Sequence, residues 1–304
     1  SARDPGHLWL YEAAADRWQL IAQLRKEVDP RRMAQVDFVR IRARDGRELP
    51  LWLTIPPGRK PGDGGPAVVL LHGGPWVRGG HWRWSPMEQF LASRGYLVVS
   101  PEFRGSAGYG QAHERAGDRQ WGRAMQDDVA DAVRWATAQG WADRWCIAGA
   151  SYGGYATLMG LANDPALYRC GVAWVAVADL LLYVGGSWWV DDDISGSGRR
   201  HFLPERVGHP EKDAEMLRAV SPVEQAARIR APLLLAYGER DRRVPLAHGE
   251  RLRKALRAEA REPEWVVYDG EGHGWLKLDS HVDFARRVEA FLARHLGTGD
   301  QSRK

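Results

Sequence analysis

One serine of this sequence stands in the pattern Gly-x-Ser-x-Gly, between two apolar runs. Cys146–Ala150 precede Ser151, and Tyr155–Leu161 follow it. This order predicts a sharp strand-to-helix turn that holds the serine hydroxyl out at the edge of a sheet, as a nucleophile requires. Gly149 and Gly153 suit such a turn, because a Cβ at either position would collide with neighbouring backbone. The N-terminus of the helix also carries a partial positive charge, which favours an oxyanion beside the serine.

A serine hydroxyl is a weak nucleophile and needs a base, and the base needs an acidic partner that orients it. Two later apolar runs, 232–237 and 264–268, read as buried strands, and each is followed by a polar loop. The first loop contains Asp241 and the second contains His273. The order Ser151, Asp241, His273 is that of the α/β-hydrolases. We therefore predict these three residues as a catalytic triad.

Other acids and bases lie nearby in the sequence and compete for the two partner roles. The competing acids are Glu239, Asp269 and Glu271. The competing bases are His248, His281 and His295. The three competing histidines fall in predicted helices, whereas His273 lies between glycines at the end of a strand. The position of His273 therefore favours it as the base.

An oxyanion requires two backbone N–H donors near the nucleophile. Tyr152, directly after the serine, is expected to supply one. The turn His72–Pro75, directly after an apolar run, is expected to supply the other from Gly74; a purely structural tight turn is the alternative. The glycine-rich stretch Gly105–Gly110 lacks the spacing of a dinucleotide loop and is interpreted as structural.

From residue 67 onward the sequence alternates short apolar runs with amphipathic ones, which is typical of a parallel sheet with crossover helices. The expected strands are 67–71, 96–100, 144–148, 169–177, 232–237 and 264–268. The expected helices are 86–93, 123–139, 153–163, 246–258 and 280–296. The pattern predicts an α/β-hydrolase fold, a doubly wound and mostly parallel sheet with helices on both faces.

Two hairpins precede this alternation. The first pairs 7–11 with 17–21, and the second pairs 36–42 with 49–55 across an Asp-Gly turn. The first hairpin is set apart from the pattern of the rest of the chain. We therefore divide the chain into an N-terminal segment, 1–30, and a hydrolase domain, 31–304.

Composition narrows the range of functions. The 304 residues are 44% hydrophobic and 27% charged, and 43 basic against 39 acidic residues give a net charge of +4. The basic residues are dispersed, so a nucleic-acid partner is not expected. No stretch reaches the length of a transmembrane helix, so no membrane partner is expected. Cys146 and Cys170 are interpreted as buried free thiols. Asp191–Asp193 lack the spacing of a metal-binding loop and are interpreted as a solvated turn. No cofactor or metal is predicted.

Five motifs together resemble the catalytic domain of the prolyl oligopeptidase family of serine peptidases, especially its acylaminoacyl-peptidase and dipeptidyl-peptidase-like members. They are His72–Pro75, Arg104–Gly110, Gly149–Gly154, Asp241–Pro245 and Gly272–Gly274. The resemblance implies hydrolysis of peptide or acyl-aminoacyl bonds of short peptides through an acyl-enzyme. It also supports Gly74 as an oxyanion donor.

The resemblance further implies a pocket for the side chain that precedes the cleaved bond. Val244 matches a position that lines this pocket, and Trp188 or Trp189 falls where an aromatic wall is expected. This placement agrees with the aromatic-rich segment 178–222, which interrupts the strand–helix alternation. With Tyr152 added, the pocket is expected to accept an apolar or aromatic side chain.

Members of this family carry an N-terminal β-propeller, and residues 7–24 resemble strands of a final blade. We therefore expect a propeller in the full-length protein, of which this chain is the catalytic part. The family resemblance also leaves a homo-oligomer open. A cytoplasmic location is expected, with the periplasm left open because the sequence begins Ser-Ala without Met. A carboxylesterase on the same fold and a non-catalytic interaction protein remain the alternative functions.

Overall fold

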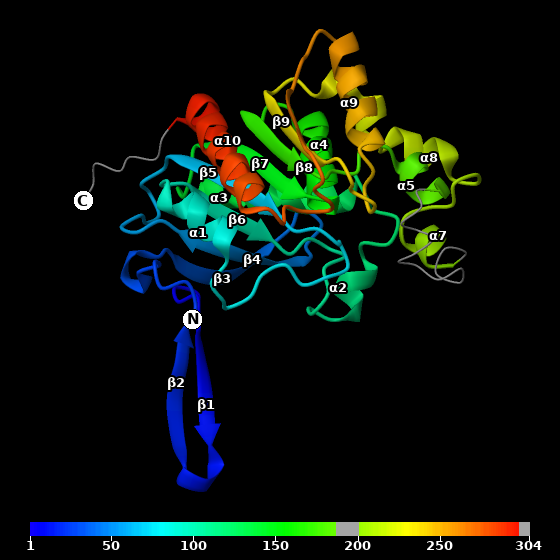
Figure 1. Ribbon diagram of the computed structural model, residues 1–304. Helices are drawn as coiled ribbons and strands as arrows, with labels where there is room; N and C mark the ends of the chain where they lie inside the picture. The colour runs from blue at the N-terminus through cyan, green and yellow to red at the C-terminus, as the bar shows by residue number, and fades with distance from the viewer. Residues whose placement is uncertain (187–200, 298–304) are drawn as a thin grey trace.

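A mixed eight-stranded sheet forms the centre of the computed structural model, which describes residues 1–186 and 201–297 (Figure 1). The order of the strands across the sheet is β10-β9-β8-β7-β5-β6-β4-β3. The strands are β3 (Gln35–Arg42), β4 (Glu48–Ile55), β5 (Pro66–Leu71), β6 (Leu97–Pro101), β7 (Arg144–Ala150), β8 (Cys170–Trp174), β9 (Leu233–Gly238) and β10 (Glu264–Tyr268). β3, β4 and β6 pair antiparallel, and all other pairs are parallel. Parallel strands end at the same edge of the sheet, so the loops that follow them can build one site.

Helices cover both faces of the sheet, as predicted (Figure 1). The helices of the described residues are α1 (Pro86–Ser93), α2 (Gln111–Arg115), α3 (Ala124–Ala138), α4 (Tyr152–Asn163), α5 (Leu180–Gly186), α7 (Leu203–Arg206), α8 (Ala214–Ala219), α9 (Ala247–Ala258) and α10 (Leu278–Leu296). α3, α4 and α9 contribute to the larger apolar core, on one face. α1 and α10 close the smaller core on the other face. Short 3-10 turns lie at Ala13–Ala15, Pro30–Arg32 and Pro222–Arg228.

The predicted strand over 169–177 is wrong at its C-terminal end. β8 stops at Trp174, and the next residue, Val175, has φ 44°. The left-handed backbone at a β-branched residue breaks the ladder. Beyond this point the chain still bonds to its neighbours, since Val175 N–H donates to Ala236 O and Val177 N–H to Ser151 O. Trp174 O accepts from Ser151 N–H, so the end of β8 lies beside the predicted nucleophile.

The first hairpin forms a separate two-stranded sheet of β1 (His7–Glu12) and β2 (Arg17–Gln23). It projects away from the large sheet in Figure 1. Its large apolar side chains are exposed, including Trp9 at 51% and Trp18 at 64%. Because neighbouring residues of a strand point to opposite sides, both faces of this ribbon are apolar.

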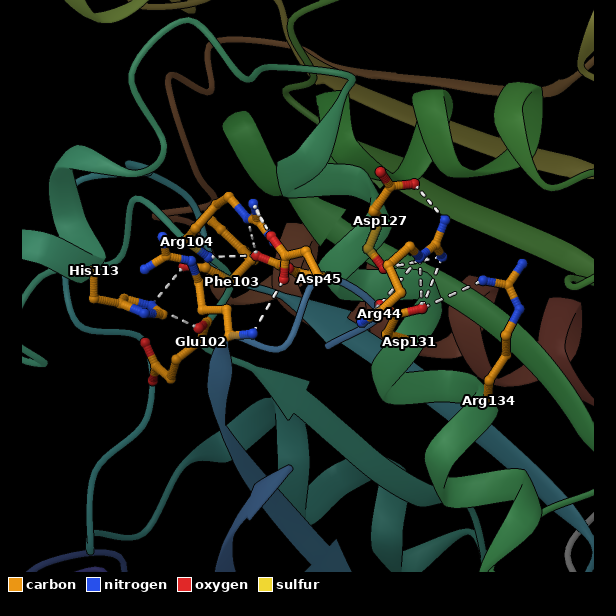
Figure 2. Close-up of polar contacts among 11 residues, drawn as sticks. Arg44, Asp45, Glu102, Phe103, Arg104, His113, Asp127, Asp131 and Arg134 are labelled. Atoms are coloured by element: carbon orange, nitrogen blue, oxygen red, sulfur yellow. Dashed lines mark hydrogen bonds and ion pairs between the residues drawn. The ribbon is translucent and has the colours of Figure 1, made fainter. Parts of the chain in front are cut away.

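Charged side chains tie the β3–β4 turn to α3 (Figure 2). Arg44 pairs with Asp127 and Asp131 of α3. Arg104, in the loop after β6, pairs with Asp45 of the turn and with Asp128 of α3, whose side chain is fully buried. These hydrogen bonds raise the pKa of the Arg104 guanidinium and keep it charged. The loop after β6 is thereby held rigidly against α3.

The described residues contain neither a membrane-spanning helix nor a metal cluster. None of the helices in 1–186 and 201–297 is long and apolar enough to cross a membrane. No group of three or more acidic, histidine or cysteine side chains in these ranges could hold a metal ion. Asp191–Asp193 lie outside the described residues.

Candidate active site

Ser151 occupies the sharp turn between β7 and α4, with φ 58° and ψ −120°. Such a conformation costs a non-glycine residue roughly 1–3 kcal/mol, and the surrounding backbone must enforce it. Gly149 and Gly153 permit this packing. A Cβ on Gly149 would lie 2.5 Å from the carbonyl carbon of Gly153, and a Cβ on Gly153 would overlap the carbonyl oxygen of Leu71. The predicted nucleophile elbow is therefore present, with the N-terminus of α4 directly behind the serine.

Asp241 and His273 are in contact, as the sequence predicted. His273 Nδ1 lies 2.8 Å from Asp241 Oδ2. The other carboxylate oxygen, Oδ1, accepts hydrogen bonds from the N–H groups of Arg243 and Val244 at 2.8 and 2.9 Å. Since the Asp241 side chain is fully buried and each oxygen accepts, His273 Nδ1 must be the donor. In the neutral imidazole, Nε2 of His273 is then the nitrogen that can accept a proton.

A glycine at the end of β9 brings the two loops together. A Cβ on Gly238 would overlap the carbonyl oxygen of Gly272, so only glycine allows the His273 loop to lie this close. Backbone hydrogen bonds fasten the contact: Glu239 N–H donates to Tyr268 O and Arg240 N–H to Glu271 O. The position of His273 relative to Asp241 is therefore set largely by backbone packing.

Two of the three competing acids, Glu271 and Glu239, have other partners. Glu271 is buried, and its carboxylate accepts from the N–H groups of Leu276 and Lys277. Burial opposes its ionisation, but these hydrogen bonds and that of Ser280 prevail and lower its pKa. Glu239 accepts from Gly270 N–H.

The competing histidines also lie on other elements. His248 is buried on α9, where its Nδ1 faces the N–H groups of Ala178 and Asp179. His281 and His295 are on α10. The contact with Asp241 thus separates His273 from the alternatives.

Ser151 reaches the same edge of the sheet from β7, two strands from β9. Two interstrand spacings amount to about 10 Å, which two facing side chains can span. Within the described residues the Ser151 hydroxyl forms no hydrogen bond to His273. Catalytic hydrogen bonds are often long in the absence of substrate and tighten only when it binds. The structure therefore joins Asp241 to His273, and the role of Ser151 as their partner stays a prediction.

The two predicted oxyanion donors flank the serine. Tyr152 is the first residue of α4, so its N–H has no acceptor within the helix. Gly74 has φ 115° and belongs to a turn that packs on the nucleophile, since a Cβ on Gly73 would lie 3.4 Å from Ser151 Cβ. Across the described residues, neither Gly74 nor Tyr152 donates its N–H to a backbone or side-chain acceptor. Both N–H groups are available, and their assignment as oxyanion donors stays a prediction.

The residues predicted to line the substrate pocket are only partly described. Tyr152 and Val244 are each 2% exposed. The Tyr152 ring packs edge-on against Trp121, with the ring centroids 4.5 Å apart. Trp188 and Trp189 lie outside the described residues, so the composition of the pocket stays a prediction.

Sequence reasoning missed a cavity of about 240 Å³ beside the site. Its wall includes Gly73, which precedes Gly74, and Ala150, which precedes Ser151, together with His72 and the buried Glu102. The sequence did point to His72, because this residue is part of the His-Gly-Gly-Pro motif. The motif alone did not show what the imidazole contacts.

Known proteins resemble this chain over nearly its whole length. A dipeptidyl aminopeptidase BIII from Pseudoxanthomonas mexicana is 34% identical over 98% of the chain, and the match covers 44% of that relative. A dipeptidyl peptidase family member 6 from Caenorhabditis elegans is 31% identical over 98% of the chain and 43% of the relative. The crystal structure of a puromycin hydrolase superposes with a TM-score of 0.81 at 28% identity, over 93% of this chain and 43% of that one. The chain thus spans less than half the length of these relatives.

The family model described as "Prolyl oligopeptidase family" matches residues 82–299. This range contains the Ser151 turn, Asp241 and His273, and it covers more than half of the chain. The predicted resemblance is thereby confirmed: the chain belongs to the prolyl oligopeptidase family.

Proposed function

We propose that this chain is the catalytic part of a serine peptidase that cleaves short peptides or acyl-peptides through an acyl-enzyme on Ser151. The observation that carries the proposal is the contact between Asp241 Oδ2 and His273 Nδ1. It supports the tautomer in which Nε2 can act as the base, at the sheet edge that also carries the Ser151 turn. The relatives named as dipeptidyl peptidases support a peptide substrate.

The proposed reaction uses groups of the chain alone. His273 Nε2 accepts the proton of the Ser151 hydroxyl while the Ser151 oxygen attacks the substrate carbonyl. The N–H groups of Gly74 and Tyr152 donate to the resulting oxyanion. His273 then returns the proton to the departing amine, and Asp241 stabilises the imidazolium throughout. A water molecule then attacks the acyl-enzyme by the same steps, with His273 again as the base, and the acyl group is released from Ser151.

The side chain before the cleaved bond is proposed to be apolar. The support is the apolar character of Tyr152 and Val244, which stand next to Ser151 in the chain and next to the Asp241 carboxylate. Trp188 and Trp189 are proposed as further walls by the family resemblance. Homo-oligomer formation and a cytoplasmic location stay predictions.

We also propose that a β-propeller precedes this chain in the full-length protein. The ribbon of β1 and β2 exposes apolar side chains on both faces, and Leu8, Leu10 and Ile21 are each more than half exposed. An exposed apolar surface of this kind is typical of a contact with another part of a protein. The greater length of the relatives supports a partner within the same chain.

The decisive test replaces Ser151 by Ala and measures hydrolysis of aminoacyl-p-nitroanilides and p-nitrophenyl esters. The variant is expected to lose at least about a thousandfold in kcat for both while its circular dichroism is unchanged. Labelling of the wild type by a fluorophosphonate, lost in the variant, identifies the nucleophile. Ester turnover without anilide turnover would favour a carboxylesterase. An unlabelled wild type without turnover would favour a non-catalytic protein.

A further inference from the structure

We propose that His72 is a positioning residue of the oxyanion turn, held by Ser106 and by the loop that Glu102 fixes. The proposal rests on the function proposed above and extends its machinery to a side chain that touches neither the nucleophile nor the base. It begins with one hydrogen bond: His72 Nδ1 lies 2.8 Å from the carbonyl oxygen of Gly73. A carbonyl oxygen can only accept, so Nδ1 carries the proton.

The carbonyl that His72 holds belongs to the peptide whose other end is the N–H of Gly74. This peptide is trans and planar, so its C=O and N–H point in opposite directions. A bond from His72 to the oxygen therefore turns the Gly74 N–H away from the imidazole. The same bond polarises the peptide and strengthens its N–H as a donor. Since Gly73 packs on Ser151, the orientation of this one peptide decides where the predicted oxyanion donor points.

The far side of the imidazole is fixed as well. His72 Nε2 lies 2.9 Å from Ser106 Oγ and, as the unprotonated nitrogen, accepts its hydrogen. Ser106 is fully buried, and its own N–H donates to Phe103 O. The Phe103 ring stacks on the imidazole, with centroids 4.4 Å apart and an interplanar angle of 13°. The ring of His72 can therefore neither rotate nor exchange its donor and acceptor nitrogens without losing a bond.

Glu102 supports the imidazole indirectly, through the loop that contains Gly79 and Gly80, because a carboxylate cannot bond to an unprotonated Nε2. Its carboxylate is 1% exposed and lies 3.6 Å from His72 Nε2. It accepts hydrogen bonds from the N–H groups of Gly79 and Gly80. A Cβ on Gly79 would overlap the His72 ring, so this loop is pressed against the imidazole. Burial lowers the pKa of His72, against the opposing Glu102 carboxylate, which agrees with the neutral tautomer.

The loop after β6, which contains Glu102, Phe103 and Ser106, is itself held by further hydrogen bonds (Figure 2). His113 Nε2 lies 3.0 and 3.1 Å from the carbonyl oxygens of Glu102 and Phe103 and donates to them. Arg104 donates to the buried Asp128 from Nε, Nη2 and its backbone N–H. The loop after β6 is thus held firmly in place. His72 connects this loop to the oxyanion turn through its hydrogen bonds to Ser106 and to the Gly73 carbonyl oxygen.

Two isosteric variants separate this role from simple packing. In His72→Asn the amide nitrogen takes the place of Nδ1 and keeps the bond to Gly73 O. In His72→Gln the amide takes the place of Nε2 and keeps the contact with Ser106. Measured in the full native chain, His72→Asn is expected to retain kcat within about tenfold of wild type. His72→Gln is expected to lose about a hundredfold, as when an oxyanion donor is impaired, with KM changed by less than about threefold.

The rate of fluorophosphonate labelling of Ser151 should fall in parallel, because the reagent's oxygen needs the same donors. Equal losses in both variants, a better His72→Gln, or a loss confined to KM would overturn the proposal. Urea unfolding shows whether each variant is folded. If neither is, Ser106→Ala decides: a loss of kcat that Ser106→Thr restores supports the proposal, and an unchanged kcat overturns it. A wild type that neither labels nor turns over would refute the proposed peptidase function itself, a result distinct from all of these.

Discussion

His248 is expected to make the fold sensitive to acid, and replacing it by Asn should remove that sensitivity. Its Nδ1 lies 3.3 Å from the N–H groups of both Ala178 and Asp179, so it accepts from them and must be unprotonated. The proton is on Nε2, which is buried without a partner among the described residues. Burial lowers the pKa of His248 to about 4; the carboxylates of Asp179 and Asp241 oppose this effect, and Arg251 adds to it.

The sign and size of the effect are set by this lowered pKa. The folded chain disfavours the charged imidazole, so the unfolded chain binds more protons between pH 6.5 and 4, and stability falls as the pH falls through that window. The full interval corresponds to about 3 kcal/mol at 1.36 kcal/mol per pKa unit. At pH 5 about 2 kcal/mol of this is already lost, since the unfolded imidazole is then almost fully charged. Above pH 7.5 the contribution of His248 is constant.

In His248→Asn the side-chain oxygen replaces Nδ1 as acceptor and does not titrate. Urea unfolding followed by tryptophan fluorescence at pH 7.5 and pH 5 measures both proteins. The variant is expected to be less stable at pH 7.5, because it is smaller, and to lose about 2 kcal/mol less than wild type between the two pH values. With an m value of about 3 kcal/mol/M, this is a difference of about 0.7 M in the midpoint shift.

The matched control is His281→Asn, which makes the same change on the exposed side of α10. It should follow the wild-type pH dependence. Parallel curves for wild type and His248→Asn would refute the reasoning, because they would show that His248 does not carry the acid sensitivity.

Three further predictions concern the site and its supports. Gly238→Ala should lower kcat/KM by about a hundredfold, because its Cβ displaces the His273 loop, whereas Gly185→Ala, whose Cβ would meet no atom of the described residues within 4 Å, should not; anilide kinetics compare the two. Asp241→Asn should lower kcat by about ten-thousandfold with the fold retained, since the wrong tautomer of His273 is then favoured; a loss below tenfold would contradict the triad. Asp128→Ala should destabilise the chain by about 3 kcal/mol by leaving Arg104 buried without its main partner, while Glu48→Ala, which breaks the exposed pair with Arg40, should cost less than about 1 kcal/mol in urea unfolding.

The sequence was most informative where local chemistry and strand order decide the structure. The turn at Ser151 follows from small residues between an apolar strand and an apolar helix, and the backbone there is left-handed as such a turn requires. The alternation of strands and helices predicted the sheet, because buried parallel strands are apolar on both faces. The pairing of Asp241 with His273 was predicted from the order of the strands and from the loops that follow them.

The sequence was least informative where contacts between distant segments decide the structure. The end of β8 at Trp174 depends on the left-handed backbone of Val175, which no propensity of valine predicts. The exclusion of Glu271 depends on its hydrogen bonds to the N–H groups of Leu276 and Lys277, which only the folded loop reveals. Likewise, the contact of His72 with Ser106 joins residues 34 positions apart.

The glycines explain why the site could be located more reliably than its substrate. Gly153 packs on the backbone of β5, Gly149 on that of α4, and Gly238 on the loop of His273, so backbone meets backbone at each of these junctions. Such junctions position the predicted catalytic residues through backbone contacts, and they can be recognised in the sequence because glycine is required. The predicted substrate contacts depend instead on side chains of segments such as 178–222, whose apolar residues could fill a core or a pocket equally well. The predicted catalytic geometry therefore depends on glycines whose replacement the backbone forbids, whereas the predicted substrate pocket depends on side chains.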